Sequence, residues 1–312
     1  MIRYLLRRLA LMIPVGLGVV TLTFVIMQLT PGDPAIAYLG DKATPAAVAA
    51  LRAQWGLDQP LLVQYLNFLG GLVTGDLGES LYFKVPISEL LAVRMPPTLI
   101  LMLIASVLAV LISLPLAAWA ATSRSVVAAI VIRVFTATIQ GIPTFFLGSL
   151  MITFLALRLR WFPVGGYGDT IGEHLHSLLL PALAIALNMV PLLVRSLVNS
   201  IGEALDSEFV DFGRSKGLKN MTVLLRYALR NGSISGISIL GIQVGNLAGG
   251  ALVVENVFAI PGMGSMLMNG VLNRDFPTVQ VCTVIFAVLV VVIYLLTDIA
   301  YGWLDPRARV RR

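Results

Sequence analysis

Six long apolar segments set the main restriction on what this chain can fold into. A helix needs about 20 consecutive apolar residues to cross a bilayer. The segments that reach roughly this length are residues 9–29, 98–121, 134–157, 178–199, 232–254 and 279–303. Only 12% of the 312 residues are charged, whereas a typical soluble domain has about 25%. The sequence therefore predicts an all-α integral membrane protein with six transmembrane helices.

The distribution of charge predicts how these helices are oriented. If the N-terminus is cytoplasmic, most of the 22 Lys and Arg residues but fewer than half of the 16 Asp and Glu residues fall on the cytoplasmic side. Basic residues are enriched on that side of membrane proteins, so both termini are predicted to be cytoplasmic. The first apolar segment is too long for a signal peptide and lacks a small-x-small cleavage site. We expect it to be retained as an anchor.

The predicted spans divide the chain into four parts. These are the cytoplasmic N-terminus with the first span at 1–29, an extracytoplasmic helical cap at 30–97, a five-helix core at 98–304 that includes a loop at 200–231, and a cytoplasmic tail at 305–312. Within the cap, Thr44 and Pro45 predict the start of a helix that stops at Gly56. A second, amphipathic helix is predicted after Pro60.

The fifth apolar segment combines small and polar residues. Its glycines fall into two runs with four-residue spacing, Gly232 and Gly236, then Gly241, Gly245 and Gly249. Small residues at this spacing let helix backbones approach closely. Gln243 and Asn246 lie three residues apart in the same segment. The pattern leaves two readings open, a lining for a transport pathway or a tight helix contact without a transport role.

Prolines predict irregularities in two other spans. Gln140 precedes a Gly-Ile-Pro sequence that ends at Pro143, which should kink or break the third span. Pro181 and Pro191 should do the same in the fourth.

The sequence offers little chemistry of its own. Its single cysteine, Cys282, excludes an intrachain disulfide, and His174 and His176 have no third metal ligand nearby. It also lacks the Gly-rich phosphate loop of ATPases and the motifs of zinc proteases and serine hydrolases. We therefore predict a protein that is not an enzyme and has no cofactor, and we find no pair of catalytic residues at membrane depth.

A charged segment at 207–232 interrupts the apolar chain. Asp206 or Ser207 can cap a helix with acidic residues in its first turn and basic residues in its last, an order that complements the helix dipole. Gly217 can end this helix. Phe209 and Phe212 are three residues apart and should share one face. Asn220 is expected to cap a second short helix, over residues 221–230.

This segment resembles the cytoplasmic EAA loop of ATP-binding-cassette importer permeases. Asp211, Phe212 and Gly213 take the E-A-A places, Gly217 takes the place of the later glycine, and residues 227–230 close the pattern. Asp replaces Glu, Phe and Gly replace the two alanines, and Arg replaces the final Pro, as in the variant of the peptide-permease branch. The resemblance implies a coupling loop that docks on an ATPase through Glu208, Phe209, Asp211, Phe212, Gly213, Arg214, Lys216 and Gly217.

Motifs along nearly the whole chain support the same branch. They include "RYLLRRL", "LTPGDPA", "GLDQPLLVQY", "GDLGES", "LLLPALAIA", "GGALVVENVFAIPGMG", "RDFPTVQ" and "LDPRAR". In this order they resemble the "B"-type inner-membrane subunit of the dipeptide, oligopeptide and nickel importers. The resemblance implies a type-I importer permease fold in the bacterial inner membrane.

The resemblance also implies partners and cargo. The partners are a second, homologous permease chain, two ATPase subunits that carry ATP and Mg²⁺, and an extracytoplasmic binding protein, with no role for nucleic acid. Peptides are the expected cargo, while nickel chelates, glutathione or another small solute stay open, as does a passive channel. For the translocation pathway we expect a contribution from Gln140, Gln243, Asn246, Glu255 and Asn256.

Overall fold

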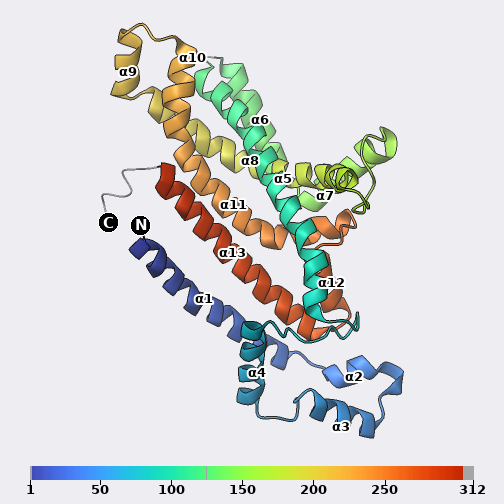
Figure 1. Ribbon diagram of the computed structural model, residues 1–312. Helices are drawn as coiled ribbons and strands as arrows, with labels where there is room; N and C mark the ends of the chain where they lie inside the picture. The colour runs from blue at the N-terminus through green and yellow to red at the C-terminus, as the bar shows by residue number, and fades with distance from the viewer. Residues whose placement is uncertain (1, 124, 305–312) are drawn as a thin grey trace. The chain divides into compact units, whose positions relative to one another are not determined.

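The computed structural model describes residues 2–123 and 125–304, and these residues are almost entirely helical (Figure 1). In chain order the helices are α1 (Ile2–Leu29), α2 (Pro34–Leu39), η1 (Gly40–Lys42), α3 (Pro45–Gln54), α4 (Leu61–Thr74), α5 (Ile87–Thr122), α6 (Val126–Gly141), α7 (Thr144–Met151), η2 (Ile152–Arg158), α8 (Ile171–Leu205), α9 (Glu208–Ser215), α10 (Asn220–Thr222), η3 (Val223–Ala228), α11 (Leu229–Val257), α12 (Met263–Leu272) and α13 (Phe276–Leu304). The segments η2 and η3 are π-helical, and η1 is a 3₁₀ turn. The predicted cytoplasmic tail at 305–312 lies outside the described residues.

The chain forms two compact units. The first comprises residues 1–98 and 261–291, and the second comprises residues 99–260 and 292–312.

The first unit contains the two helices that the sequence predicted in the cap. The Thr44 hydroxyl accepts a hydrogen bond from the Ala47 amide at the start of α3, and Gly56 takes a left-handed φ of 67° just beyond its end. The helix predicted after Pro60 is α4. Helix α2 was not predicted, although Asp33 caps it by accepting from the Ala35 amide and Pro34 follows as its first residue.

Helix α5 contains the predicted second span at 98–121 and extends it toward the N-terminus, because it starts at Ile87 and runs through Pro96 and Pro97. Thr98 is fully buried, and its hydroxyl accepts a hydrogen bond of 2.8 Å from the Met263 amide at the start of α12. Helix α12 has a glycine, Gly262, at its N-cap position. A side chain from a distant helix therefore supplies the cap that Gly262 cannot.

A buried carboxylate fixes the turn before α5. Asp275 is fully buried and accepts hydrogen bonds from the Ser80 hydroxyl at 2.5 Å, the Leu81 amide at 3.1 Å and the Thr278 hydroxyl at 2.7 Å. Asp275 thus caps α13 and holds residues 80–82 against it. The sequence motifs "GDLGES" and "RDFPTVQ" meet at this contact.

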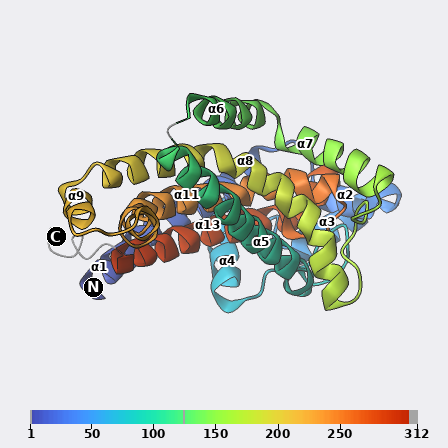
Figure 2. The ribbon, with the colours of Figure 1, turned by 90° about the horizontal axis from the view of Figure 1, so that it is seen from above.

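In the second unit, α8 and α11 lie side by side (Figures 1 and 2). A Cβ atom at Gly232 would lie 2.9 Å from a side-chain carbon of Ile201, and one at Gly236 would lie 2.6 Å from a side-chain carbon of Leu197. At Gly232 the Ile201 backbone nitrogen also lies within 3.1 Å of that position, so a larger residue there would push the two helices apart. Helix α8 continues through Pro181 and Pro191, so these prolines do not break it, and the alternative of a kink stays a prediction.

The third span is broken, as Pro143 predicted. Helices α6 and α7 meet at an angle of 101°, and Ile142 between them has an extended backbone. A residue before proline avoids the helical region, which explains the position of the break. The predicted third span at 134–157 is therefore divided between α6 and the helical stretch of α7 and η2.

By length and composition, four helices among the described residues could cross a membrane, or five if the bent pair counts as one span. The apolar part of α1 at Ile13–Leu29 is shorter than the roughly 20 residues that cross a bilayer. The count of six spans stays a prediction.

Candidate functional site

The predicted loop helix is present as α9, which lies beyond the end of α8 (Figure 1). Ser207 occupies the N-cap position with an extended backbone, but its hydroxyl donates to the Ala204 carbonyl and makes no cap. Gly217 follows the helix with a left-handed φ of 79°, as predicted. The local sequence therefore fixes both ends of α9 through backbone geometry.

Helix α9 has one buried and one exposed face. Val210 and Gly213 are buried, and a Cβ atom at Gly213 would lie 3.3 Å from a methyl carbon of Leu218. Phe209 and Phe212 are 44% and 61% exposed. The two aromatic side chains therefore lie together on the open face, whereas Gly213 faces the interior of its own chain.

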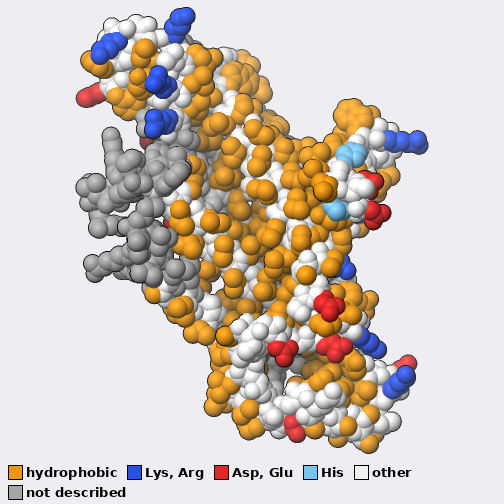
Figure 3. Space-filling view, viewed as in Figure 1, with side chains coloured by type: hydrophobic (Ala, Val, Ile, Leu, Met, Phe, Trp, Pro, Cys, Tyr) orange, Lys and Arg blue, Asp and Glu red, His pale blue; other side chains and the backbone are white. Residues whose placement is uncertain are grey.

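Charged side chains surround this aromatic face. The Lys216 ammonium lies 4.4 Å from the centre of the Phe212 ring, and Arg214 forms an ion pair with Asp211 at 3.6 Å. Glu208 is exposed in the first turn. On the face shown in Figure 3, Lys and Arg side chains gather around α9 and α10, while hydrophobic side chains cover the neighbouring helices.

The second short helix predicted over 221–230 does not exist as a separate element. Helices α10, η3 and α11 follow one another without interruption from Asn220 to Val257. No proline interrupts this stretch, and Gly232, which could have ended a helix, packs against Ile201 instead. Ala228 is fully buried in a cluster with Ala117, Leu197, Ile201 and Ala204. The loop is therefore continuous with the glycine-rich helix.

Two glycines of α11 also lie against α13. A Cβ atom at Gly241 would overlap the Thr297 side chain, and one at Gly245 would lie 2.9 Å from the Tyr294 ring. Gly249 has open space around it. The sequence did not reveal a further polar contact between α8 and α11, in which the hydroxyls of Ser200 and Ser235 lie 2.5 Å apart.

The five expected pathway residues differ in their exposure within this chain. Gln140 and Asn246 are exposed, and Gln243 is half-buried. Asn256 is exposed and donates to the Leu252 carbonyl of its own helix at 2.7 Å. Glu255 is fully buried in this chain. The contribution of these residues to a pathway stays a prediction.

A cleft in the first unit escaped prediction. It is lined by side chains from α1, α2, α3 and α4, the 78–81 turn and the start of α13. Local patterns could not reveal it, because its polar residues are spread over more than 250 positions of the sequence, from Gln28 to Gln280. The single local signal is the pair of Asp33 and Arg52, which are charges within an apolar protein.

Two family models together match most of the chain. Residues 113–310 match the model of the binding-protein-dependent transport system inner membrane component, and residues 1–102 match its N-terminal model. Proteins of this family are membrane transport subunits and not enzymes.

Curated relatives match the chain over nearly its full length. The oligopeptide transport system permease protein AppB of Bacillus subtilis is 37% identical over 98% of this chain and 99% of the relative. A putative peptide permease protein of Brucella ovis is 36% identical over 99% and 100%, respectively. A probable peptide ABC transporter permease protein of Sinorhizobium fredii is 31% identical over 98% and 99%.

The fold also has a solved counterpart. A chain of the MetNI methionine ABC transporter, in an inward-facing conformation, superposes with a TM-score of 0.56, covering 69% of this chain and 96% of that chain at 15% identity. Identity this low supports the fold alone, which is that of a type-I ABC importer permease. The chain is therefore a multi-pass membrane protein that belongs to the family of binding-protein-dependent transport system inner membrane components.

Proposed function

We propose that this chain is the membrane-spanning subunit of an ATP-driven, binding-protein-dependent importer of di- or oligopeptides. The family supports a transport subunit that works with an ATPase and a substrate-binding protein. The names of the relatives support a peptide cargo. Nickel chelates, glutathione or another small solute are the alternative cargoes.

The observation that carries the coupling role is the exposed aromatic face of α9. Phe209 and Phe212 are open to solvent on a short helix surrounded by charge. Exposed apolar patches with a polar rim mark protein interaction sites, and a helix that presents an apolar face suits a groove on a partner. We assign the partner as the cytoplasmic ATPase, with Glu208, Asp211, Arg214 and Lys216 at the rim of the contact.

The continuity of the loop with α11 supports a mechanism for coupling. Residues 216–219 join α9 directly to α10, and α10, η3 and α11 are one uninterrupted helical stretch. Because Ala228 is packed among side chains of α5 and α8, a displacement of α9 would act on several spans together. Closure of the ATPase dimer would in this way turn the bundle from inward-facing to outward-facing.

The complete importer would contain this chain, a second homologous permease, two ATPases that bind ATP and Mg²⁺, and an extracytoplasmic binding protein. It would lie in the bacterial inner membrane with both termini of this chain in the cytoplasm. Gln140, Gln243, Asn246, Glu255 and Asn256 stay as proposed contributors to the pathway, with Glu255 buried in the isolated chain.

Reconstitution tests the proposal directly. The importer, assembled with its partner subunits in proteoliposomes, should accumulate labelled trialanine only with both ATP and the binding protein present. Uptake without ATP would contradict the active mechanism. If the binding protein binds a metal chelate and does not bind peptides, the result would favour the alternative cargo over peptides.

A further inference from the structure

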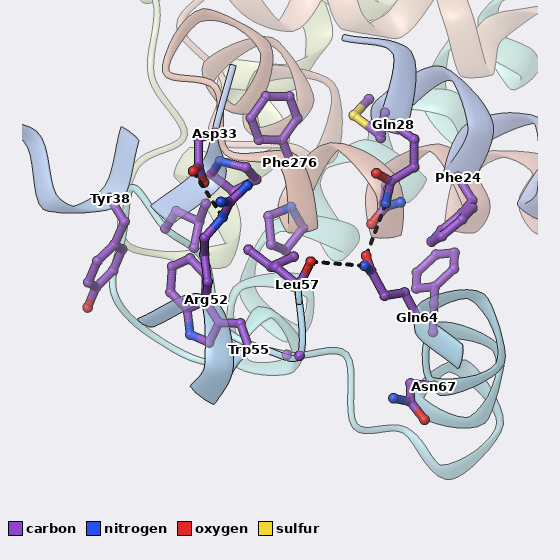
Figure 4. Close-up of a pocket in the computed structure, with 18 of the residues that line it drawn as sticks. Phe24, Gln28, Asp33, Tyr38, Arg52, Trp55, Leu57, Gln64, Asn67 and Phe276 are labelled. Atoms are coloured by element: carbon purple, nitrogen blue, oxygen red, sulfur yellow. Dashed lines mark hydrogen bonds and ion pairs between the residues drawn. The ribbon is translucent and has the colours of Figure 1, made fainter. Parts of the chain in front are cut away.

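The first unit contains a cleft of about 780 Å³, referred to below as the α1–α4 cleft (Figure 4). Sites for small molecules typically measure about 300–1,000 Å³. The lining combines aromatic side chains with polar and charged ones. Its size and lining are therefore those of a site for a small polar ligand.

Side-chain amides form a linked row along the cleft. The residues involved are Gln28, Gln59, Gln64 and Asn67, with Gln280 also lining the cleft. Gln28 donates to the Gln64 side chain at 3.2 Å, and Gln64 donates to the Leu57 carbonyl at 3.2 Å (Figure 4). Each amide has two donor hydrogens and an acceptor oxygen with two lone pairs. Gln64 also donates to the Gln59 carbonyl at 2.8 Å, so both of its donor hydrogens are used within the protein. Gln28 and Asn67 each donate one hydrogen to another amide of the row. Their second hydrogens and their carbonyl oxygens can bind the C=O and N–H groups of a peptide backbone.

An ion pair provides both signs of charge. The Arg52 Nε atom lies 3.1 Å from Asp33 Oδ2, and the other oxygen of Asp33 accepts from the Ala35 amide. The side chains are 53% and 16% exposed, respectively. Glu79 also lines the cleft. Among the described residues Arg52 pairs through Nε, which leaves its two terminal nitrogens for a carboxylate.

Aromatic rings complete the walls. Tyr38 and Trp55 pack edge to face with ring centres 5.2 Å apart, and Phe24 stacks near Phe68 at 6.3 Å. Phe276 lies on the α13 side (Figure 4). These rings can pack against apolar side chains of different sizes.

We propose that the α1–α4 cleft binds a short peptide, with Arg52 on its terminal carboxylate and Asp33 and Glu79 on its terminal ammonium group. A zwitterion is matched by a site that offers both charges. An apolar ligand would take water away from the half-exposed Arg52 side chain and offer it no hydrogen bond in return, which is costly for a polar group. A simple anion would be repelled by Asp33 and Glu79. The inference rests on the proposed function, because it assigns peptide as the ligand.

The test measures binding of trialanine to the assembled importer in lipid nanodiscs, without binding protein or nucleotide, by saturation-transfer NMR. C-amidated and N-acetylated trialanine report on the two termini. Arg52→Gln should lower the affinity for trialanine about tenfold or more, as expected for loss of a charged hydrogen bond. The same variant should leave the C-amidated peptide unaffected, since that peptide has no carboxylate to lose.

A second variant tests the other terminus. Asp33→Asn keeps a side chain that can cap α2 but removes the negative charge. The variant should lower the affinity for trialanine and leave the affinity for the N-acetylated peptide nearly unchanged. Arg158→Gln, at an exposed arginine outside the cleft, serves as the matched control and should change none of the three affinities.

Two outcomes would overturn the inference. One is equal weakening of free and C-amidated peptide by Arg52→Gln, and the other is trialanine binding that both cleft variants leave intact. Uptake of trialanine by the wild-type importer in the same preparation separates the two proposals. If uptake is normal while the cleft does not discriminate between termini, the cleft proposal alone fails; if no peptide is transported, the proposed function fails.

Discussion

Phe212 is an aromatic side chain that is 61% exposed on a helix whose opposite face is buried. An isolated exposed hydrophobic residue needs no explanation, but here a second one, Phe209, lies on the same face within a charged segment. Asp275 is the opposite case, a carboxylate that is fully buried with a hydrogen bond from each of several neighbours. An exposed phenylalanine and a buried carboxylate are both unusual. We therefore expect each residue to have a role that can be measured.

Replacement of Phe212 by Asp should weaken binding to the ATPase. Burial of a Phe side chain contributes about 1.5–3 kcal/mol, which corresponds to roughly a tenfold or greater loss of affinity. Co-purification and ATP-dependent uptake measure the loss. Tyr82→Asp, at an aromatic residue that is 52% exposed in the first unit, is the control and should retain the ATPase. Full retention of the ATPase by the Phe212 variant would exclude α9 as the docking element.

Replacement of Asp275 by Ala should lower stability. The change leaves the Ser80 hydroxyl and the Leu81 amide without their acceptor, and hydrogen bonds to charged groups contribute about 1.5–3 kcal/mol each. We expect a lower thermal unfolding midpoint of the solubilised importer and faster proteolysis near residues 80–82. Asp41→Ala, at an exposed position, should leave both unchanged. If the two variants unfold alike, the buried hydrogen bonds do not hold the turn.

At the scale of elements, packing between helices decided what local sequence left open. The four-residue spacing of the glycines in the fifth span allows close helix contacts, but the two runs face different neighbours. Gly232 and Gly236 lie against α8, whereas Gly241 and Gly245 lie against the part of α13 that belongs to the second unit. Gly249 has no neighbour within 4 Å. The same glycine motif therefore contains positions where an added side chain would clash, such as Gly241, and a position with room for one, Gly249.

This contrast gives a matched pair of variants. Gly241→Ala places a methyl group in the Thr297 side chain, and overpacking typically costs about 1–3 kcal/mol. Gly249→Ala adds the same group in open space and should be neutral or slightly stabilising, because alanine favours helix over glycine. Thermal unfolding of the two variants measures the difference. Equal stability would show that α11 and α13 can separate at little cost.

For the molecule as a whole, the distribution of charge predicts the membrane topology. Lys42 and Asp169 are predicted outside and Lys219 inside, and all three are exposed. Single cysteines at these positions, in a Cys282→Ala background, should react with an impermeant reagent from the expected sides. Cys282 is buried, so its replacement removes background labelling at small structural cost. Labelling of positions 42 and 219 from the same side would overturn the six-span topology.

The sequence by itself determined the features that depend on neighbouring residues. Apolar length predicted the membrane class, Thr44 and Gly56 predicted the ends of α3, and Pro143 predicted the break between α6 and α7. These predictions succeed because backbone hydrogen bonding and proline geometry act within a few residues. The sequence could not decide between a kink and a break at Pro181 and Pro191, and α8 continues through both prolines.

Only the tertiary structure decided which residues meet across the chain. Asp275 and Ser80 are 195 positions apart, and the residues around either one do not predict the contact with the other. Gly213 is buried with Leu218 beside it, so that a Cβ atom there would lie 3.3 Å from a Leu218 methyl carbon. The α1–α4 cleft is lined by residues from four helices, a turn and the start of α13. Side-chain contacts of this kind depend on how helices pack, and the hydrophobic effect that packs them is non-directional. Local sequence therefore predicts which faces are buried but not which partners they find.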